Sequence, residues 1–445
     1  MNTDFNKNKE RIGQVLRCFR IEWSDMNVID GTSVTLYEFK PAIGTRLSKI
    51  RNLKDELAIA LEAKSVRVIA PIPGRGTVGI EVPHSEKSLL HVSEIFNSEE
   101  FLTSGMELPL AIGKTMTNKI FMADLANMPH LLVAGATGQG KSVGLNVMLM
   151  SLLQKKTPEE LKLVLIDPKK VELSAYETIA KPYLTKMLGA DSIITDAPQA
   201  QDMLDLLCRL MEKRYTMLNE VGARNIREYN SKSEKKMEYY VIVIDEYGDL
   251  IMDRQYGRTL EYYICRLAQK ARAVGMHMII STQRPSATIV TGNIKANFPT
   301  RIAFRTTTGT DSRVILDQVG AEKLTGNGDM LYFAGAEVTR VQCAYIGTHE
   351  VMNTCRQLAD AYDDCRQKII CTEKPEKNPD TSLETLKEYW IGRCLRTIEN
   401  HKNDLWYNNP FNYRNPLAIM NYFKSLTNVH DVEMAGMFHD CLLDK

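Results

Sequence analysis

The eight residues from Gly135 to Ser142, Gly-Ala-Thr-Gly-Gln-Gly-Lys-Ser, constrain the fold of this chain more than any other feature of its sequence. They match the pattern G-x-x-x-x-G-K-[ST] at every fixed position. An apolar segment suited to a strand, residues 131–134, precedes them, and one suited to a helix, residues 143–153, follows. In a strand–turn–helix arrangement of this kind, backbone N–H groups and the positive end of the helix surround phosphate oxygens. The sequence therefore predicts a phosphate-binding loop.

The loop provides the first set of candidate residues, which bind a nucleotide. They are Gly135, Ala136, Thr137, Gly138, Gln139, Gly140, Lys141, Ser142 and Val143. We expect Lys141 to reach the β- and γ-phosphates and the Ser142 hydroxyl to bind Mg²⁺. The expected cofactors are therefore ATP and Mg²⁺. A chance glycine-rich turn is the alternative, and the matching segments on both sides argue against it.

Two carboxylates, Asp245 and Glu246, follow the apolar run 239–244. Ionised carboxylates at the end of a buried strand cost free energy unless a cation pairs with them. We expect Asp245 to orient the Mg²⁺ shell and Glu246 to polarise the attacking water. A solvated strand end is the alternative, which the presence of a phosphate loop makes less attractive.

Gln283 follows a further apolar run, residues 277–281. Ligands of open α/β sheets bind at the carboxyl ends of the strands, where this side chain would lie. It could contact the γ-phosphate or the water and report hydrolysis to a moving part. On spacing alone, an ordinary loop glutamine is an equally good interpretation.

The part of the chain from about 105 to 350 alternates short apolar runs with longer amphipathic segments. The predicted strands are 130–134, 162–166, 240–244, 277–281 and 301–304, and the predicted helices include 200–219 and 258–273. Such apolar runs are typical of strands buried on both faces of a parallel sheet, which indicates a three-layer α/β domain. Residues 157–160, Thr-Pro-Glu-Glu, carry a helix-start pattern.

Three regions follow from these patterns. Residues 1–104 are expected to form a small α+β unit, with strands near 20–23 and 34–39, a helix at 49–63 and a hairpin over 66–83. Residues 105–372 form the α/β domain. Residues 373–445 begin with a charged, proline-bearing linker and are expected to form an aromatic-rich helical module.

Composition excludes several classes of protein. The chain is 44% hydrophobic and 25% charged, which is typical of globular domains and not of disordered chains. No apolar stretch is long enough to span a membrane, and the polar first ten residues do not resemble a secretory signal. The nine cysteines include no C-x-x-C pair, so we expect reduced thiols in a cytoplasm. The net charge of +1 means that any nucleic-acid surface must be local.

Seven segments in order, the phosphate loop among them, resemble the FtsK/SpoIIIE family of DNA translocases. They are Met128–Val143, Leu165–Tyr176, Ile244–Leu250, Arg266–His277, Ser281–Ser286, Ile294–Phe304 and Asp311–Glu322. The resemblance covers about residues 15–350. It implies a RecA-like P-loop ATPase core, preceded by the family's α subdomain with its signature at Ile72–Pro83. It also implies a ring, usually hexameric, around double-stranded DNA, with ATP hydrolysed between subunits to move the DNA.

The resemblance also assigns roles to residues. It places Lys141 and Ser142 on nucleotide and metal, Asp245 and Glu246 as the acidic pair, and Gln283 as the sensor. A neighbouring subunit should supply an arginine finger to the transition state.

Arg272 is the first choice for this finger because it precedes the strand that ends at the sensor, and Arg301 and Arg313 are rivals. The family's pore-facing loops point to Arg284, Lys295 and Arg301 as DNA contacts, which would be independent of DNA sequence and sensitive to salt. A surface ion pair is the alternative for each arginine, and a plain solvated loop is the alternative for the DNA contacts.

The sequence also departs from the family. We find no membrane helices before the motor motifs, and residues 373–445 lack the strand–turn–wing pattern of the family's γ subdomain. We therefore expect no direct membrane insertion, a protein partner for the C-terminal module, and a role on a plasmid, phage or integrative element. The rival functions are a conjugative coupling ATPase, a peptide-exporting ATPase and an ATP-binding scaffold without turnover. Intact Glu246 argues against the scaffold.

Overall fold

The computed structural model describes residues 2–370, apart from 32–33, 64–65, 73, 85–88 and 336. The chain divides into two compact units, residues 1–370 and 371–445. The expected helical module at 373–445 lies outside the described residues. In the part that the structure describes, no helix combines the length and apolar character that a membrane crossing requires.

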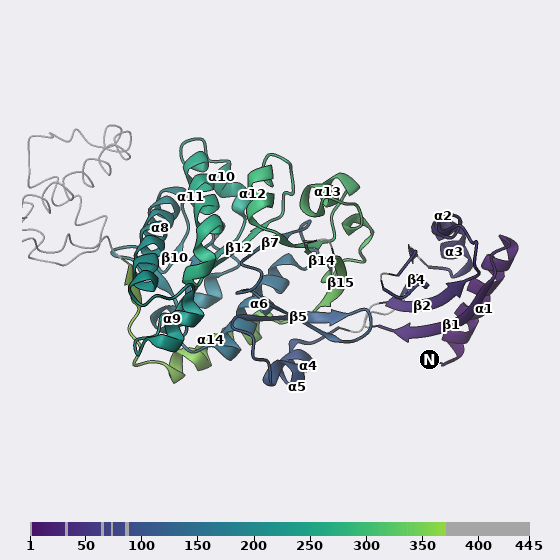
Figure 1. The fold of residues 1–445 in the computed structure, drawn as a ribbon, viewed down its shortest axis with the longest axis horizontal. Coiled ribbons are helices and arrows are strands. Elements are labelled where there is room, and N and C mark those ends of the chain that lie inside the picture. Colours follow the sequence, from purple (N-terminus) through teal and green to yellow (C-terminus); the bar gives the residue numbers. More distant parts are fainter. Residues whose placement is uncertain are drawn as a thin grey trace, which may run out of the picture. The chain divides into compact units, whose positions relative to one another are not determined.

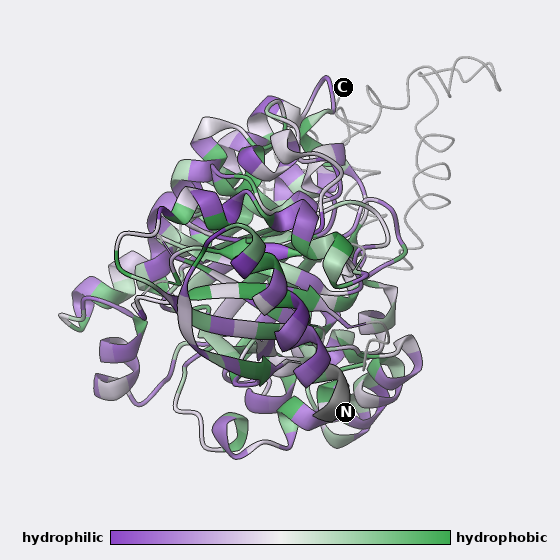
Figure 2. Cartoon of the chain, turned by 90° about the vertical axis from the view of Figure 1, so that its right-hand side faces the viewer, coloured by the Kyte–Doolittle hydropathy of each residue, from purple (hydrophilic) through white to green (hydrophobic). Residues whose placement is uncertain are grey.

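The N-terminal part of the first unit is a small α+β fold. Its elements are α1 (Asn2–Cys18), β1 (Trp23–Asp30), β2 (Val34–Pro41), α2 (Leu47–Arg51), α3 (Lys54–Ala60), β3 (Arg67–Ile69) and β4 (Val78–Pro83). The strands form an antiparallel sheet in the order β1-β2-β4-β3. Figure 2 looks on to this part and shows polar and apolar residues interspersed along its strands and helices.

The predicted helix 49–63 is two short helices, α2 and α3, separated at Asn52 and Leu53. Its apolar spacing continues across the break, because Ile50, Leu53 and Leu57 are all buried in the same core. Hydrophobic periodicity reports which face is buried and carries little information about a two-residue interruption. The predicted strand near 20–23 begins only at Trp23.

The larger part is a mixed sheet with helices packed on it (Figure 1). Its strands are β5 (Pro109–Thr115), β6 (Ile120–Asp124), β7 (His130–Ala134), β8 (Leu161–Ile166), β10 (Ile193–Ile194), β11 (Tyr239–Ile244), β12 (Met276–Thr282), β13 (Thr300–Phe304), β14 (Asp329–Ala334) and β15 (Glu337–Cys343). Within the described residues the order is β10-β8-β11-β12-β7-β13-β14-β15-β5-β6. The first six strands are parallel and the rest add on in antiparallel fashion. All five predicted strands are therefore confirmed as adjacent parallel strands.

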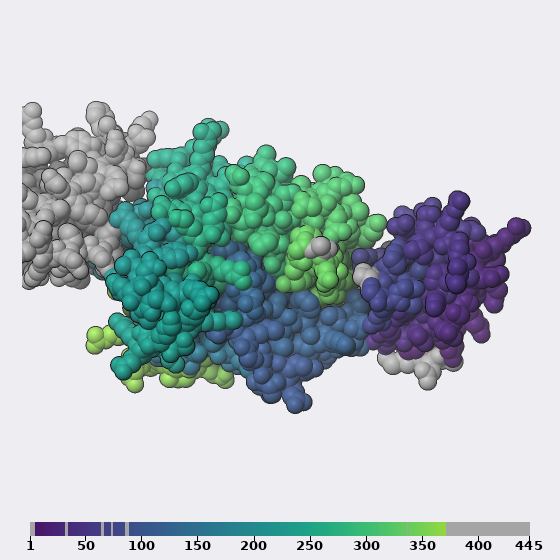
Figure 3. All heavy atoms as spheres, viewed as in Figure 1, coloured from purple at the N-terminus to yellow at the C-terminus, as the bar shows by residue number. Residues whose placement is uncertain are grey.

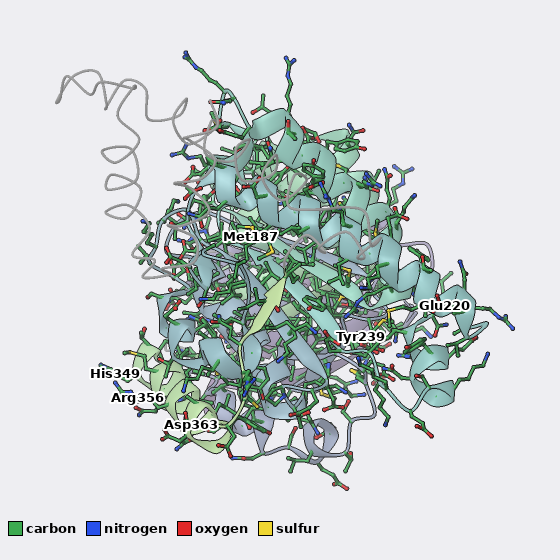
Figure 4. All side chains as sticks on the ribbon, turned by 90° about the vertical axis from the view of Figure 1, so that its left-hand side faces the viewer. Met187, Glu220, Tyr239, His349, Arg356 and Asp363 are labelled. Atoms are coloured by element: carbon green, nitrogen blue, oxygen red, sulfur yellow. The ribbon has the colours of Figure 1, made fainter. Side chains whose placement is uncertain are left out.

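The helices pack on this sheet and share its core. They are α4 (Val92–Phe96), α5 (Glu99–Leu102), α6 (Lys141–Lys155), α7 (Ala180–Tyr183), α8 (Ala197–Glu220), α9 (Ile226–Lys232), α10 (Tyr247–Ile251), α11 (Gly257–Lys270), α12 (Gly292–Asn297), α13 (Gly309–Leu316) and α14 (Thr348–Ala361). Three short 3₁₀ turns in the described residues are η1 (Ser174–Ile179), η2 (Ala271–Val274) and η3 (Ala321–Lys323). A separate parallel pair joins β9 (Thr185–Met187) to β16 (Lys368–Ile370). Figure 4 labels Met187 of β9 together with His349 and Arg356 of α14.

Residues 90–101 pack in the core of the larger part, although they precede the boundary that we expected at residue 104. Leu90, Val92, Ile95 and Phe101 share a core with β5 and α6. Lys155 of α6 donates to the carbonyl of Leu102 at 2.8 Å, which fixes the end of α5. Figure 3 shows α4 and α5 as a blue projection on the visible face.

Two local predictions are wrong. Residues 157–160 form a turn that leads directly into β8. The Glu160 carboxylate does accept the N–H of Thr157 at 3.1 Å, as in a helix start, but the apolar run from Leu161 pairs with β11 instead. The stretch between Arg284 and Arg301, where we expected a pore-facing loop, contains α12, whose buried Ile294 anchors it to the core.

A buried ion cluster joins the two parts of the first unit. Arg340 of β15 binds Asp329 of β14 through Nη2 (2.7 Å) and Nε (2.9 Å), and its Nη1 contacts Glu81 of β4. Burial alone would lower the pKa of Arg340 and raise that of Asp329, but their pairing reverses both shifts. The contact with Glu81 ties the N-terminal sheet to the larger one.

Candidate nucleotide-binding site

Three neighbouring parallel strands bring the candidate residues together. β7, β12 and β11 end at the same edge of the sheet, since Ala134 lies opposite Thr282 and Ile280 lies opposite Ile244. The phosphate loop follows β7, the acidic pair follows β11 and Gln283 follows β12. The structure therefore places the phosphate loop, the acidic pair and Gln283 at one edge of the sheet.

The loop has the backbone shape that its glycines permit. Gly138 and Gly140 have φ angles of +73° and +107°, in the region that side chains disfavour. A Cβ atom on Gly140 would also lie 2.7 Å from the backbone nitrogen of Gly328, whose N–H donates to the Gln139 carbonyl at 3.0 Å. α6 begins directly at Lys141, so its free N–H groups face the loop.

Lys141 forms a buried ion pair at the centre of this edge. Its Nζ lies 2.6 Å from Oδ1 of Asp245 and 2.9 Å from Oγ of Ser281. The lysine side chain is 3% exposed and that of Asp245 is fully buried. A lysine at the start of α6 and a carboxylate at the end of β11 therefore share one small polar space.

The residues around Ser142 fit a divalent cation. Oδ2 of Asp245 is buried and has no hydrogen-bond partner within the described residues. Ser142 Oγ donates to Glu172 Oε1 at 2.7 Å, so a second carboxylate lies beside the predicted metal ligand. No cluster of three or more His, Cys, Asp or Glu side chains suited to a metal occurs in the described part of the chain. Mg²⁺ commonly binds through one or two carboxylates together with substrate phosphates, so this donor set suits it.

Glu246 is fully buried and held in place from several sides. Thr282 Oγ1 donates to its Oε1 at 2.8 Å, and the N–H of Gln283 donates to its Oε2 at 3.1 Å. Lys169 Nζ lies 3.3 Å from Oε2. Partial burial lowers the pKa of Lys169, but the charge and hydrogen bond of Glu246 together with the charges of Asp249 and Asp245 outweigh it, so the net shift is upward. Glu246 itself has a φ of +54°, which is uncommon for a residue with a side chain and is often found at functional sites.

Gln283 bridges two of these segments. Its Oε1 accepts from the Thr137 hydroxyl at 2.7 Å, which links the end of β12 to the tip of the phosphate loop. Its backbone N–H binds Glu246. A displacement of either the phosphate loop or the acidic pair would therefore change a hydrogen bond of Gln283.

Lys169 and Glu172 belong to the site although no role was predicted for them. Both lie on the turn after β8, whose shape is set by the buried Asp167. The Asp167 carboxylate accepts from the backbone N–H groups of Lys169, Val171 and Leu173. The only signal in the sequence was that this turn falls within the family-like segment Leu165–Tyr176.

A pocket of about 440 Å³ opens beside the loop. One end is lined by the loop, including Lys141 and Ser142, and by Gln283. The rest of the wall comes from Leu89, Leu90, Val143, Asn327, Gly328, Gln342, Cys343, Ala344 and Tyr345. Asn327 and Gly328 directly precede β14, Gln342 and Cys343 end β15, Ala344 and Tyr345 follow it, and Leu89 and Leu90 come before α4. Apart from Val143, none of these residues was predicted as a site residue.

The candidate arginines lie in different environments. Arg272 is exposed in η2, at the edge of the sheet opposite to Gln283, because β12 runs between them. Arg313 and Arg284 are also exposed. Arg301 is buried. Its guanidinium donates hydrogen bonds to the carboxylate of Asp317 and to the backbone carbonyls of Phe298, Ile315 and Lys295.

Lys295 pairs with the same aspartate as Arg301, with Nζ 2.6 Å from Asp317 Oδ1. Its side chain is 26% exposed, which leaves part of it available to a ligand. The Arg301 side chain, in contrast, is only 8% exposed and uses four of its N–H groups on protein oxygens, so its geometry favours a structural role over DNA contact or service as a finger.

The family models match most of the first unit. The model of the FtsK alpha domain matches residues 1–84, and that of the FtsK/SpoIIIE family matches residues 91–287. A DNA translocase FtsK from Chlorobaculum tepidum is 45% identical over 350 residues, which are 77% of this chain and 43% of that protein. A DNA translocase FtsK from Haemophilus influenzae is 42% identical over 373 residues, 77% of this chain and 69% of that protein. The chain thus spans less than half the length of the first relative.

One solved structure extends the comparison. The pCW3 conjugation coupling protein TcpA, in its monomer form with ATPgS, is 25% identical with a TM-score of 0.55. The match covers 76% of this chain and 93% of TcpA. The RecA-like P-loop architecture expected from the sequence is therefore confirmed.

Proposed function

The chain belongs to the FtsK/SpoIIIE family, and we propose that it is an ATP hydrolase that moves double-stranded DNA through a ring of its own copies. The observation that supports this most directly is the edge where Lys141, Asp245 and Glu246 meet the phosphate loop. These groups provide what phosphoryl transfer requires, namely cations for the phosphates and a base for water.

Nucleotide binding in this proposal uses the loop and Lys141. The N–H groups from Gly138 to Ser142 bind the phosphates, as the positive end of α6 favours. Phosphate oxygens offer Lys141 a second anionic acceptor beside Asp245. As Lys141 turns to them, Oδ1 of Asp245 keeps the hydrogen bond from Ser281 Oγ at 2.7 Å, and the unpartnered Oδ2 is the oxygen offered to a cation.

Ser142 and Asp245 would hold Mg²⁺, with Glu172 next to them. Bound Mg²⁺ neutralises charge on the β- and γ-oxygens. Glu246 accepts a hydrogen bond from the attacking water and so raises its nucleophilicity. Thr282 and the N–H of Gln283 keep that carboxylate oriented, and Gln283 senses the change through Thr137.

Arg272 completes the site from a neighbouring copy. Within one chain it lies at the opposite edge of the sheet from Gln283, so it cannot serve its own nucleotide. This position supports an interfacial role. A ring in which each copy presents Arg272 to the next one would couple turnover around the assembly.

DNA contact in this proposal uses Arg284 and Lys295. Arg284 is exposed directly after Gln283, so phosphate contact and the sensor share one segment. Lys295 lies on α12, in the same connection between β12 and β13. We place this activity in the cytoplasm, where ATP and DNA are both available.

The test is the rate of ATP hydrolysis by the full chain with duplex DNA, single-stranded DNA or no DNA, at two salt concentrations. We expect stimulation by long duplex that falls steeply as salt rises, because phosphate contacts release counterions. A turnover indifferent to duplex at both salt concentrations would contradict the translocase function.

A conjugative coupling ATPase is the second candidate, favoured by the match that covers 93% of TcpA. Such a protein delivers a processed single strand to a secretion channel. Stimulation by single strands alone in the same assay would favour it over the duplex translocase.

A further inference from the structure

The nucleotide pocket has two chemically different ends. The end beside Lys141, Ser142 and Gln283 is polar and fits phosphates. Cys343 lines the other end, where burial raises the pKa of its thiol to about 12 and keeps it neutral. Once the phosphates are fixed at the first end, the nucleoside must extend along the second.

Gln342 provides an unused acceptor in this second end. Its Nε2 donates to the carbonyl of Asn327 at 2.9 Å and to that of Cys343 at 3.3 Å. Carbonyl oxygens only accept, so these two contacts fix which side of the amide carries the nitrogen. The Oε1 atom is buried and has no hydrogen-bond partner among the described residues, and Gln342 as a whole is 8% exposed.

A buried acceptor without a donor costs free energy that a ligand can recover. Adenine offers the matching group, since its 6-amino group donates, whereas guanine carries a carbonyl oxygen at the same position. An oxygen facing Oε1 would leave two acceptors opposed. The chemistry of this wall therefore selects adenine over guanine.

Apolar side chains beside Gln342 provide a surface for a flat base. Tyr345 is 40% exposed and Leu89 is 63% exposed, although both are large and apolar. The N–H of Tyr345 donates to the carbonyl of Leu90 at 2.7 Å, which holds the two segments side by side. A base lying against Tyr345 and Leu89 would cover apolar surface that is now open to solvent.

We propose that Gln342 is the residue that selects adenine, by accepting a hydrogen bond from its 6-amino group, while Tyr345 and Leu89 pack against the base. This proposal rests on the proposed function, because it takes the phosphate end of the same pocket as given. It adds a specificity-determining residue that none of the family-like sequence segments includes.

The test is equilibrium binding of ATP, GTP and purine riboside 5′-triphosphate to the full-length chain, by isothermal titration calorimetry. The purine analogue has the same ring but lacks the 6-amino group. Wild-type protein should bind it roughly tenfold to a hundredfold more weakly than ATP, and should discriminate against GTP at least as strongly. This arm requires no variant.

The variants separate recognition of the 6-amino group from packing against the face of the base. Gln342→Leu should bind ATP and the purine analogue equally, whereas Tyr345→Ala should weaken both by the same factor and keep their ratio. Gln255→Leu makes the same substitution at an exposed position and should leave all three affinities unchanged.

Equal binding of ATP and the purine analogue by wild-type protein would overturn the proposal, as would an unchanged ATP-to-GTP ratio in Gln342→Leu. Neither result would affect the ATPase assignment. Failure of wild-type protein to bind ATP at all would overturn both the proposed function and this inference.

Discussion

Lys141 and Asp245 share a fully desolvated contact, with Nζ 2.6 Å from Oδ1 and the lysine side chain only 3% exposed. Each charge is stable in the interior only because the other is present. The lysine that should bind phosphate is therefore also a structural counter-ion, and the same holds for the carboxylate that should bind Mg²⁺. Stability and nucleotide chemistry are linked at this pair.

Removal of the lysine alone should destabilise the fold as well as abolish tight ATP binding. Lys141→Ala leaves Asp245 buried and unpaired, and we expect a loss of about 3–5 kcal/mol in the free energy of unfolding. The double variant Lys141→Ala/Asp245→Asn should recover much of this loss, since no buried charge remains. Urea denaturation of the wild type, of Lys141→Ala and of the double variant measures the free energy of unfolding of each protein. A double variant no more stable than Lys141→Ala would contradict the pairing argument.

Glu246→Gln should bind ATP and hydrolyse it at least about a hundredfold more slowly, because the amide cannot accept the proton of the attacking water. The single amide oxygen, placed where Oε1 lies, can still accept from Thr282 and from the N–H of Gln283, which lies 3.3 Å away, so the fold should be preserved. Steady-state turnover and nucleotide binding are measured side by side. Wild-type turnover in this variant would remove Glu246 from the proposed mechanism.

Arg272→Ala should be inactive alone and regain part of its ATPase activity when mixed with Lys141→Ala subunits. A mixed ring contains interfaces with both an intact phosphate loop and an intact arginine. Arg356→Ala, which removes an exposed arginine on α14, is the matched control and should stay active without mixing. If mixing restores nothing, Arg272 does not act across an interface.

The stability of the fold should fall as the pH drops from about 6.5 towards 4. Burial lowers the pKa of His130 to about 3 and that of His277 to about 4, against 6.5 for the ordinary side chain. Between these values the unfolded chain takes up protons that the folded chain refuses, so acid favours unfolding. Between its folded-state and unfolded-state pKa values, each histidine lowers the free energy of unfolding by up to about 1.4 kcal/mol for each pH unit of acidification. Below its folded-state pKa it adds no further pH dependence. Thermal melts across this range measure it.

The control for the pH prediction is His349, which is exposed on α14 (Figure 4). His277→Gln should flatten the pH dependence of the melting temperature, while His349→Gln should leave it unchanged. The His277 ring donates from Nδ1 to the carbonyl of Pro129 at 2.9 Å, a bond that a glutamine amide can replace. Equal slopes for both variants would contradict the assignment.

Arg340→Met should cost about 3–5 kcal/mol of stability, because it leaves the buried Asp329 carboxylate without its counter-ion and leaves the buried Glu81 with only the more distant Arg67, at 3.6 Å. The exposed pair Lys181–Asp363 provides the comparison, with side chains 66% and 77% exposed. Lys181→Ala should change stability by less than about 1 kcal/mol. Chemical denaturation of both variants tests the contrast, and similar losses would mean that burial does not set the strength of these pairs.

The parallel strands and the polar end of the site could be predicted because their signals are local. Runs such as Tyr239–Ile244 are buried on both faces and read as continuous apolar stretches. The rule that parallel strands end at one edge then brings Lys141, Asp245 and Gln283 together.

The antiparallel strands could not be predicted in the same way. β15 reads Glu-Val-Thr-Arg-Val-Gln-Cys, and its Arg340 and Gln342 are buried only because partners distant in sequence satisfy them. No local sequence pattern predicts such a strand. The base-facing wall of the pocket was missed for this reason, since it comes mostly from β15 and the residues after it.

Leu89 and Leu90 lie between the two matched family modules, residues 1–84 and 91–287, and they also line the nucleotide pocket. The backbone offers no other covalent route from one module to the other. Mechanical load on the N-terminal module that travels along the backbone therefore passes the pocket wall, whereas load carried by the Glu81–Arg340 pair reaches β15 directly. The linker between the two modules and the wall of the nucleotide pocket therefore share Leu89 and Leu90.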